Sequence, residues 1–286
     1  MSATAQSITW LLEIGAASFA GGIVGSISGL GGGIVVVPVL TLLLHMPIEQ
    51  AIGASIVSVI AVSSGAGSVY VKDRITNVRI AMFLELSTAA GALLGAGVLS
   101  RLIPPQILFI LFGLLLLGSL APIFAKLGEE LPENIQSDRI AIILRLHGSY
   151  FDKHLGRQVE YNVTGVPPAI GIMFLAGIVS GILGIGAGVL KVLAHEIFMR
   201  VPTKVSTATS NFMIGVTAAA GAGVYLRRGL VLPFVVVPVA TAVVVGAFVG
   251  TILMEKMSNA LIRKVFALVL AVAGIQMLLR GFGVKL

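Results

Sequence analysis

Two ionisable side chains lie within strongly apolar segments and are the first candidates for chemistry. Lys191 follows a glycine-rich element in GIGAGVLKVLAHEIF, and Glu85 lies in MFLELSTAAGALLGAG. A charge in such surroundings costs free energy, so it indicates either a function or a partner. Lys191 is suited to attracting an anionic substrate, and Glu85 is suited to proton coupling.

Structural roles remain open for both residues. Lys191 has a long aliphatic stem that can reach a membrane interface, or its ammonium can pair with Glu196. His195 and Glu196 come near the end of the same segment, where solvation would explain them. Ala240 stands at the position that matches Glu85 in the repeat described below, so no symmetric pair of carboxylates supports proton coupling.

Two glycine-rich elements interrupt apolar runs, Gly29-Leu30-Gly31-Gly32-Gly33-Ile34 and Gly184-Ile185-Gly186-Ala187-Gly188-Val189. Glycine opposes regular helix, and a broken helix presents backbone N–H groups and the positive end of its dipole. Anions are the natural ligands of such a break. The alternative is that glycines spaced by three or four residues only let helices pack closely. The candidate substrate-binding glycines are Gly31, Gly32, Gly33, Gly186 and Gly188.

A small polar stretch follows each glycine element and a proline shared by both, Pro47 or Pro202. Hydroxyl and amide groups can replace the hydration shell of an anion without adding a second fixed charge. Alternatively, each hydroxyl only bonds its own backbone or a neighbouring helix. The candidates in these stretches are Ser55, Thr207, Thr209, Ser210 and Asn211.

The composition is that of an all-α polytopic membrane protein. The chain is 57% hydrophobic and 11% charged, whereas soluble domains carry about 25% charged residues. The bilayer core demands roughly 20 apolar residues per helix. Stretches of that length are residues 8–28, 48–71, 80–100, 106–125, 166–185, 205–226, 230–254 and 260–279. The net charge of +7 is explained by basic residues at cytoplasmic helix ends and requires no nucleic acid.

An internal repeat divides the chain into two homologous halves. Gly22-Ile23-Val24 matches Gly177-Ile178-Val179 at an offset of 155 residues, and the offset holds without a gap for about a hundred positions. We expect residues 1–125 and 166–286 to be the two membrane repeats. Residues 126–165 form the polar linker, in which residues 139–146 are either a short interfacial helix or part of an irregular connector.

The number of membrane segments stays open between eight and ten. Residues 31–45 and 186–200 are too short to span the roughly 30 Å core as straight helices, so they are short or broken helices. If they cross, ten passes give an inverted repeat with both termini outside. If they do not, eight passes give a parallel repeat with both termini inside. The positive-inside rule fits both, and we favour inversion because broken helices in paired halves commonly accompany it.

No enzyme signature is present. No two histidines have a metal-ligand spacing on one helix, there is no cysteine, and Gly31-Gly32-Gly33 lacks the Lys-Ser or Lys-Thr of a phosphate-binding loop. We therefore expect neither a cofactor nor a metal. An intramembrane enzyme is a weak alternative, and a passive anion channel is a further one.

The phrases GLGGGIVVVPVL, GILGIGAGVLKV and VPTKVSTATSNFMIGVTAAAGAGVY resemble the sulfite exporter TauE/SafE family, also called the toluene-sulfonate uptake permease family, over residues 8–280. The resemblance implies a secondary permease of the inner membrane for small, often sulfur-containing anions such as sulfite, sulfonates and sulfoacetate. Ala187 and Leu193 depart from the family pattern, which commonly has a third glycine and a proline there. The substrate, the transport direction, the coupling ion and the oligomeric state do not follow from the resemblance.

Overall fold

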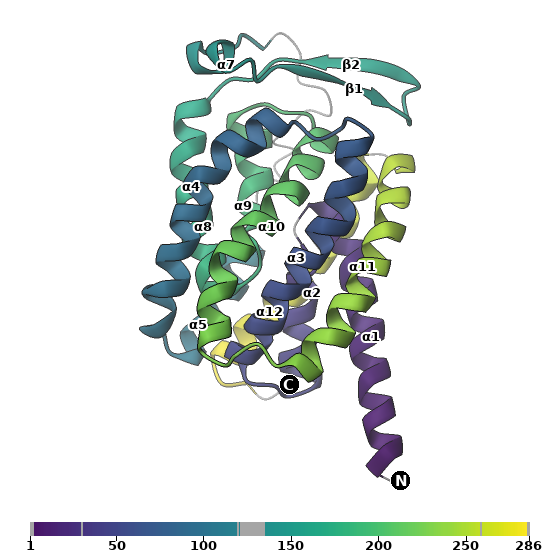
Figure 1. Cartoon of the computed structure of the whole chain (residues 1–286), viewed down its shortest axis with the longest axis vertical. Helices are drawn as coiled ribbons and strands as arrows, with labels where there is room; N and C mark the ends of the chain where they lie inside the picture. The colour runs from purple at the N-terminus through teal and green to yellow at the C-terminus, as the bar shows by residue number, and fades with distance from the viewer. Residues whose placement is uncertain (1–2, 30, 119, 121–134, 258, 285–286) are drawn as a thin grey trace.

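The computed structural model describes residues 3–29, 31–118, 120, 135–257 and 259–284, and in this part it is mostly helical (Figure 1). The expectation of a helical membrane protein is confirmed, because five helical segments here are long and apolar enough to cross a bilayer. These are Trp10–Ser28, Ile48–Lys72, Val78–Arg101, Val166–Leu183 and Pro233–Met254. The last residues of the apolar stretch 106–125 and the start of the predicted linker fall outside the described residues.

The helices before and after the linker follow one order. The first set is α1 (Ala3–Ser28), α2 (Gly33–Pro38), the π-helical turn η1 (Val39–Leu43), α3 (Ile48–Lys72), α4 (Val78–Gly97), the 3₁₀ turn η2 (Leu99–Arg101) and α5 (Pro105–Gly118). The second set is α8 (Val166–Leu183), α9 (Gly188–Leu193), the π-helical turn η3 (Ala194–Phe198), α10 (Thr203–Arg227), α11 (Pro233–Lys256) and α12 (Asn259–Gly281).

Each short helix turns back along the long helix before it. Gly25 of α1 lies against Gly31 and Gly32, and Gly21, one turn earlier, lies against Val35 and Val36 of α2. This order makes α1 and α2 antiparallel. At the corresponding place Gly165, which precedes α8, lies against Phe198 at the end of η3. Each short segment therefore runs antiparallel to the long helix before it and returns toward the end from which that helix starts.

Backbone conformation repeats with the same offset as the sequence. Left-handed φ angles occur at Gly29 and Gly184 (72° and 66°), and again at Gly31 and Gly186 (77° and 71°). Glycine has no Cβ to clash in this region, so it is the favoured residue at such positions. Ala187 also adopts a left-handed φ of 51°, at a cost that a glycine would not carry. The glycine elements are thus sharp backbone turns between two helices.

Close helix contacts are made at glycines. A Cβ at Gly22 would meet the backbone of α11 at Val243 and Ala247, and a Cβ at Gly177 would meet the backbone of α4 at Thr88 and Ala92. Small residues allow backbones to approach in a membrane, where water does not drive helices together. The pairs α1–α11 and α4–α8 therefore flank the molecule, and α3 crosses α10 between them (Figure 1).

Helix α10 is polar where it is most deeply enclosed. Every residue from Val201 to Asn211 is buried, although this stretch includes Thr203, Lys204 and Thr207. A buried polar group must find a hydrogen-bond partner or lose free energy. The partners come from α1, α9 and the segment that covers one end of the bundle.

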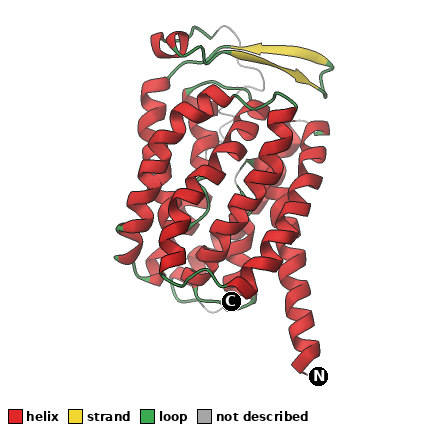
Figure 2. Ribbon diagram, viewed as in Figure 1, coloured by secondary structure: helices red, strands yellow, loops and turns green. Residues whose placement is uncertain are grey.

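That covering segment, here named the cap, comprises residues 135–165, and its hairpin is a departure from the all-α expectation. Its helix α7 (Arg139–Ile143) begins at Asp138, whose side chain accepts a hydrogen bond from the Ala141 N–H at 2.7 Å. Strands β1 (Gly148–Asp152) and β2 (Arg157–Tyr161) pair antiparallel with Tyr150 opposite Val159. Side chains alternate between buried and exposed along both strands, which is the strand period of two. Figure 2 shows this hairpin lying across the end of the helical bundle.

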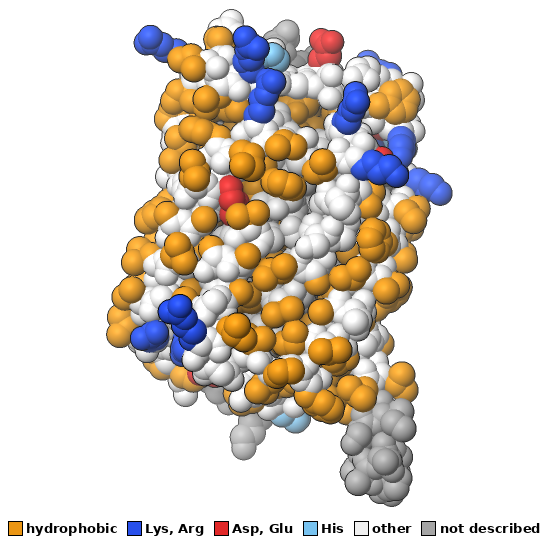
Figure 3. Space-filling model, viewed as in Figure 1, with side chains coloured by type: hydrophobic (Ala, Val, Ile, Leu, Met, Phe, Trp, Pro, Cys, Tyr) orange, Lys and Arg blue, Asp and Glu red, His pale blue; other side chains and the backbone are white. Residues whose placement is uncertain are grey.

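Both termini lie at the end of the bundle opposite the cap (Figure 1). Figure 3 shows a helical body covered with hydrophobic side chains, with Lys and Arg gathered at its two ends. Exposed Met82, Leu86 and Leu175 contribute to that apolar surface. A contiguous apolar belt between two charged ends is the surface of a multi-pass membrane protein.

Candidate functional site

A buried charged cluster joins α4, α9 and α10. The Lys191 ammonium donates to Glu85 Oε2 at 3.1 Å and to Thr217 Oγ1. Thr217 donates to Glu85 Oε1 at 2.5 Å, and Thr88 Oγ1 lies 3.1 Å from Oε2. Lys191 is fully buried, whereas 9% of the Glu85 side chain remains accessible. Since Lys191 pairs with Glu85, the alternatives that it reaches an interface or pairs with Glu196 are wrong.

The surrounding helices determine how these side chains meet. Gly91, Gly95 and Gly177 bring α4 and α8 into backbone contact, which leaves Glu85 directed toward α10. The left-handed turn at Gly184 and Gly186 reverses the chain, so that α9 carries Lys191 back toward the same helices. The glycine element thus positions Lys191, seven residues after Gly184.

His195 lies one helical turn beyond Lys191 and is fully buried. Neither of its ring nitrogens makes a hydrogen bond of normal geometry with the residues that the structure describes. The expectation that solvation explains His195 is wrong, because no solvent reaches it. A buried, unpaired imidazole beside an ammonium is a second titratable group near the cluster.

The two glycine elements are clasped by serines from opposite halves. Ser55 on α3 donates to the Gly184 carbonyl at 2.8 Å, and Ser210 on α10 donates to the Gly29 carbonyl, also at 2.8 Å. Ser210 also lies 3.5 Å from the Gly188 carbonyl. A helix end leaves carbonyls without partners within the helix, and these hydroxyls satisfy them. The side-chain hydrogen bonds at the breaks are accepted by carbonyls, and the expectation of free N–H groups there stays a prediction.

Further side chains donate hydrogen bonds to backbone carbonyls near the C-terminal ends of α1 and α8. Tyr70 on α3 donates to Ser26 O at 3.1 Å, and Tyr225 on α10 donates to Gly181 O at 3.0 Å. Asn211 Nδ2 also donates to Ser26 O, at 2.8 Å. The donors of Ser55, Ser210 and Asn211 are therefore engaged within the protein in this conformation.

Packing closes the space between the two breaks. A Cβ added at Gly31 or at Gly186 would in both cases meet Val59 of α3 and Ile214 of α10. Gly33 lies against Ser55 and the backbone of Ile185. The two breaks thus both pack against Val59 and Ile214, where α3 crosses α10.

Three predicted residues lie at the edge of this centre or outside it. Thr207 is packed against Gly29, and its carbonyl accepts from Asn211 Nδ2 at 3.2 Å. Gly32 faces Val62 and Val243. Thr209 accepts from the Asn77 N–H at 3.0 Å, which directs it toward the cap. The structure therefore separates the predicted set into a central crossing and the charged cluster of Lys191 and Glu85.

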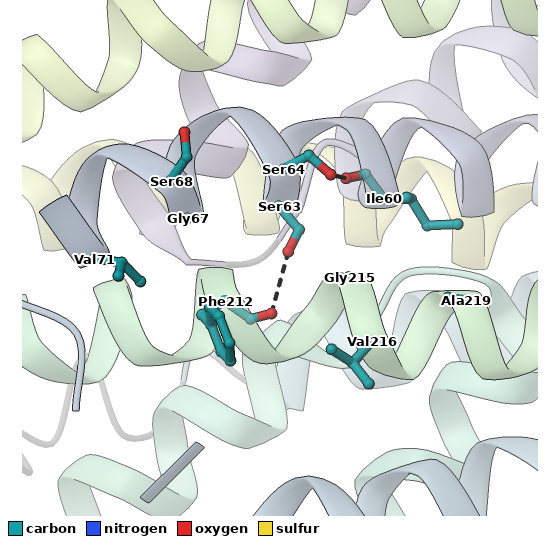
Figure 4. Close-up of a pocket in the computed structure, with 10 residues that line it drawn as sticks. All are labelled: Ile60, Ser63, Ser64, Gly67, Ser68, Val71, Phe212, Gly215, Val216 and Ala219. Atoms are coloured by element: carbon teal, nitrogen blue, oxygen red, sulfur yellow. Dashed lines mark hydrogen bonds between the residues drawn. The ribbon is translucent and has the colours of Figure 1, made fainter. Parts of the chain in front are cut away.

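A groove of about 700 Å³ lies between α3 and α10 (Figure 4). Its hydroxyl groups are those of Ser63, Ser64 and Ser68, and each donates to a backbone carbonyl. The Ser63 bond, to Phe212 O at 3.2 Å, joins the two helices. No charged side chain lines the groove. An anion would find neither a cation nor a free donor there, so the groove is a weaker candidate than the charged cluster.

Sequence reasoning missed Thr217 and Thr88, which complete the cluster. Thr217 lies seven residues after Ser210, so the two residues fall on one face of α10. That spacing was a usable signal, but the long sequence distance between Glu85 and Thr217 hid their contact. Among the described residues no group of three or more His, Cys, Asp or Glu side chains is arranged to hold a metal.

The model of the family described as "Sulfite exporter TauE/SafE" matches residues 14–277. The chain belongs to this family. The match spans all the helices that build the charged cluster and the two clasped breaks. The TauE/SafE match also makes this chain a membrane transporter, with the apolar helices that such a protein needs.

Two curated relatives of the chain come from Bacillus subtilis (strain 168). The chain is 26% identical over 267 residues to the "Probable membrane transporter protein YunE", covering 91% of this chain and 94% of that protein. It is 27% identical over 260 residues to the "Probable membrane transporter protein YdhB", covering 90% and 96%. No solved structure matches the chain.

Proposed function

We propose that this protein is a secondary transporter that moves small, sulfur-containing anions across the cytoplasmic membrane, and that Lys191 binds the anion. The observation that carries the proposal is a fully buried lysine at a backbone break inside a TauE/SafE membrane transporter. Ionisable residues within membrane segments are rare and costly, and they mark substrate or ion pathways. The family description supports sulfite and related sulfonates as the substrate class.

Comparison with the positions that match the cluster in the internal repeat supports a functional reading of the cluster. The residues 155 positions from Lys191, Thr217 and Glu85 are Val36, Val62 and Ala240. Val36 and Val62 are buried, so the same surroundings are filled there by apolar side chains. Apolar residues can replace a buried ion pair without loss of stability. The fold therefore does not need these charges for packing.

We further propose that the two halves are an inverted repeat with the cap in the cytoplasm. Three helices follow each pair of a long and a short antiparallel helix, so α8 starts at the end of the bundle opposite to α1. The cap end carries Arg79, Arg145 and Lys204, and the positive-inside rule assigns that end to the cytoplasm. Alternating access would then come from movement of one half against the other around the α3–α10 crossing.

The test is transport by the purified protein in proteoliposomes. We expect saturable uptake of sulfite or sulfoacetate, together with accelerated exchange when the same anion is present inside. Lys191→Val should lower uptake roughly tenfold or more, because a charge-assisted hydrogen bond is worth about 1.5–3 kcal/mol. Lys72→Val, at an exposed lysine in the last turn of α3, is the matched control.

Two results would contradict the proposal. Non-saturating flux with high conductance and no exchange would instead identify a passive channel. Uptake by a folded Lys191→Val variant at the rate of the wild type would remove Lys191 from the anion site. A thermal-shift screen with the same anions separates loss of binding from loss of movement, since a ligand of the folded state raises its stability.

A further inference from the structure

The charged cluster contains an arrangement that would couple the anion to a proton. The Glu85 carboxylate takes donors on both oxygens, from Thr217 on one and from Lys191 on the other. Lys191 also donates to Thr217, so the three side chains form a closed ring. Because the Thr217 hydroxyl receives a proton donor from Lys191, its own proton is directed to Glu85. The ring thus gives the Glu85 carboxylate a counterion and a hydrogen-bond donor on each oxygen.

The ring also makes Glu85 the counterion that a substrate anion has to replace. A lysine ammonium has three N–H groups, and two of them are used by Glu85 and Thr217. If an anion bound Lys191 while Glu85 remained ionised, the buried cluster would carry net negative charge. A buried charge without compensation is strongly unfavourable. An anion that arrives together with a proton on Glu85 leaves the cluster neutral.

We propose that Glu85 and the substrate anion alternate as the counterion of Lys191, and that each singly charged anion is carried with one proton on Glu85. The proposal rests on the transport function proposed above and adds its coupling. In the substrate-free state Lys191 and Glu85 neutralise each other. In the loaded state the protonated Glu85 releases the ammonium, which is neutralised by the anion. The charge of the cluster is zero in both states.

The neighbours of Glu85 leave few other groups to carry that proton. Helix α8, packed against α4, has no ionisable side chain, and the side chain of α10 that reaches Glu85 is the Thr217 hydroxyl. On its own helix Glu85 contacts Thr88, which does not titrate. From α9 and η3 the titratable groups are Lys191, His195 and the half-buried Glu196. Glu85 keeps an accessible edge, whereas Lys191 and His195 have none.

The test measures proton movement together with anion movement in proteoliposomes. Methanesulfonate is the probe, because its charge does not change over the pH range in which a carboxyl group titrates. An inward gradient of methanesulfonate should acidify the lumen of wild-type vesicles, as read by an internal pH dye. Uptake should also rise as the external pH falls.

Glu85→Gln mimics the protonated carboxyl group and separates the two movements. We expect it to retain methanesulfonate exchange, to lose the pH dependence of that exchange, and to lose lumen acidification. Glu13→Gln is the matched control, because Glu13 is an exposed carboxylate on the apolar helix α1. Acidification that persists in Glu85→Gln would overturn the proposal.

Thr217 is a positioning residue for this exchange. Thr217→Val removes one donor to the ionised carboxylate, so the pH at which uptake is half-maximal should move upward. Thr217→Ser keeps the hydroxyl and should restore the wild-type pH profile. A role of Thr217 in packing alone would lower the amount of folded protein and leave the pH profile in place.

The remaining outcomes distinguish this proposal from the proposed function. Saturable exchange without proton movement in the wild type would overturn the coupling only, whereas no flux of any sulfur-containing anion would overturn both. A pH dependence that disappears in His195→Gln and persists in Glu85→Gln would assign the proton to His195. If Glu85→Gln does not fold, the combined Glu85→Ala, Lys191→Val and Thr217→Val variant carries the residues of the three matching positions, Ala240, Val36 and Val62. It should fold and should lack pH-dependent methanesulfonate binding, and binding that persists would contradict the proposal.

Discussion

At the scale of single residues, two serines hold the centre of the molecule together. Ser55 and Ser210 lie 155 positions apart, and each donates to the carbonyl of a left-handed glycine in the other half, Gly184 or Gly29. The Ser55 and Ser210 hydroxyls are fully buried. Removing either one leaves a buried carbonyl without this donor, and that loss costs more than the bond gains.

We therefore expect Ser55→Ala and Ser210→Ala each to lower the free energy of unfolding by about 1–3 kcal/mol. Thermal unfolding of the purified variants in detergent measures the effect. Ser64→Ala is the control, because Ser64 is exposed and donates to Ile60 O on its own helix. Equal stability of Ser210→Ala and Ser64→Ala would show that the crossed hydrogen bonds do not support the fold.

At the scale of elements, the cap is attached to both halves of the bundle through polar contacts. Asp152 of β1 accepts from Lys204 in the first turn of α10 at 2.7 Å, and both side chains are buried. Asn77, which caps α4, donates to Leu146 O and to the Tyr161 hydroxyl. Burial raises the pKa of Tyr161 to about 12, so this hydroxyl stays protonated at neutral pH. The cap thus links the start of α4 to the start of α10.

The Asp152–Lys204 pair predicts a pH-dependent attachment of the hairpin. Burial acts to raise the pKa of Asp152, but hydrogen bonds from Lys204, Leu155 and His154 outweigh it and hold that pKa below its usual range. Since the folded pKa is the lower one, the stabilisation is complete above the unfolded pKa of about 3.9 and is lost as pH falls through the folded value.

Asp152→Asn should therefore weaken the cap at neutral pH by up to about 3–5 kcal/mol, because Lys204 is left buried without its partner. Hydrogen exchange of residues 148–161, corrected for the intrinsic effect of pH, measures the opening. Glu160→Gln, on the exposed side of β2, is the control. The difference between wild type and Asp152→Asn should shrink at strongly acidic pH, and a difference that grows there would refute this assignment.

At the scale of the whole molecule, the cap and the termini lie at opposite ends (Figure 1). Each short segment runs back beside α1 or α8, which is the order that the ten-pass alternative expects. The number of membrane crossings stays a prediction, and the position of both termini at one end of the bundle agrees with an inverted arrangement. Both termini are then on one side, away from the cap.

Reporter fusions test this orientation. Alkaline phosphatase, which is active only outside the cytoplasm, should be active when it is fused after Leu286 and inactive when it is inserted at Gly156 in the hairpin turn. A fluorescent protein that folds only in the cytoplasm should give the reverse pattern. A cytoplasmic C-terminus would contradict the proposed orientation, and opposite locations for the two termini would contradict the chain path itself.

Local features of the sequence predicted much of this outcome. Hydropathy predicted the helical membrane body, because every backbone polar group in a bilayer must be satisfied within a helix or a closed barrel. The glycine elements predicted the breaks, since Gly29 and Gly184 adopt left-handed backbone that other residues avoid. The hairpin of the cap was not predicted, because its strands are short and lie in a polar segment whose alternation is weak.

What the sequence determined by itself was the chemistry available: one lysine and one glutamate in apolar segments, two glycine breaks, and a family whose members are membrane transporters. Only the tertiary structure decided how these groups combine. It brought Glu85 to Lys191 across 106 positions of sequence and added Thr217 to the pair. It also placed serine hydroxyls from the opposite half on the carbonyls at the two glycine breaks. The physical reason is that hydropathy and backbone conformation are local properties, whereas a buried charge finds its counterion through the packing of distant helices.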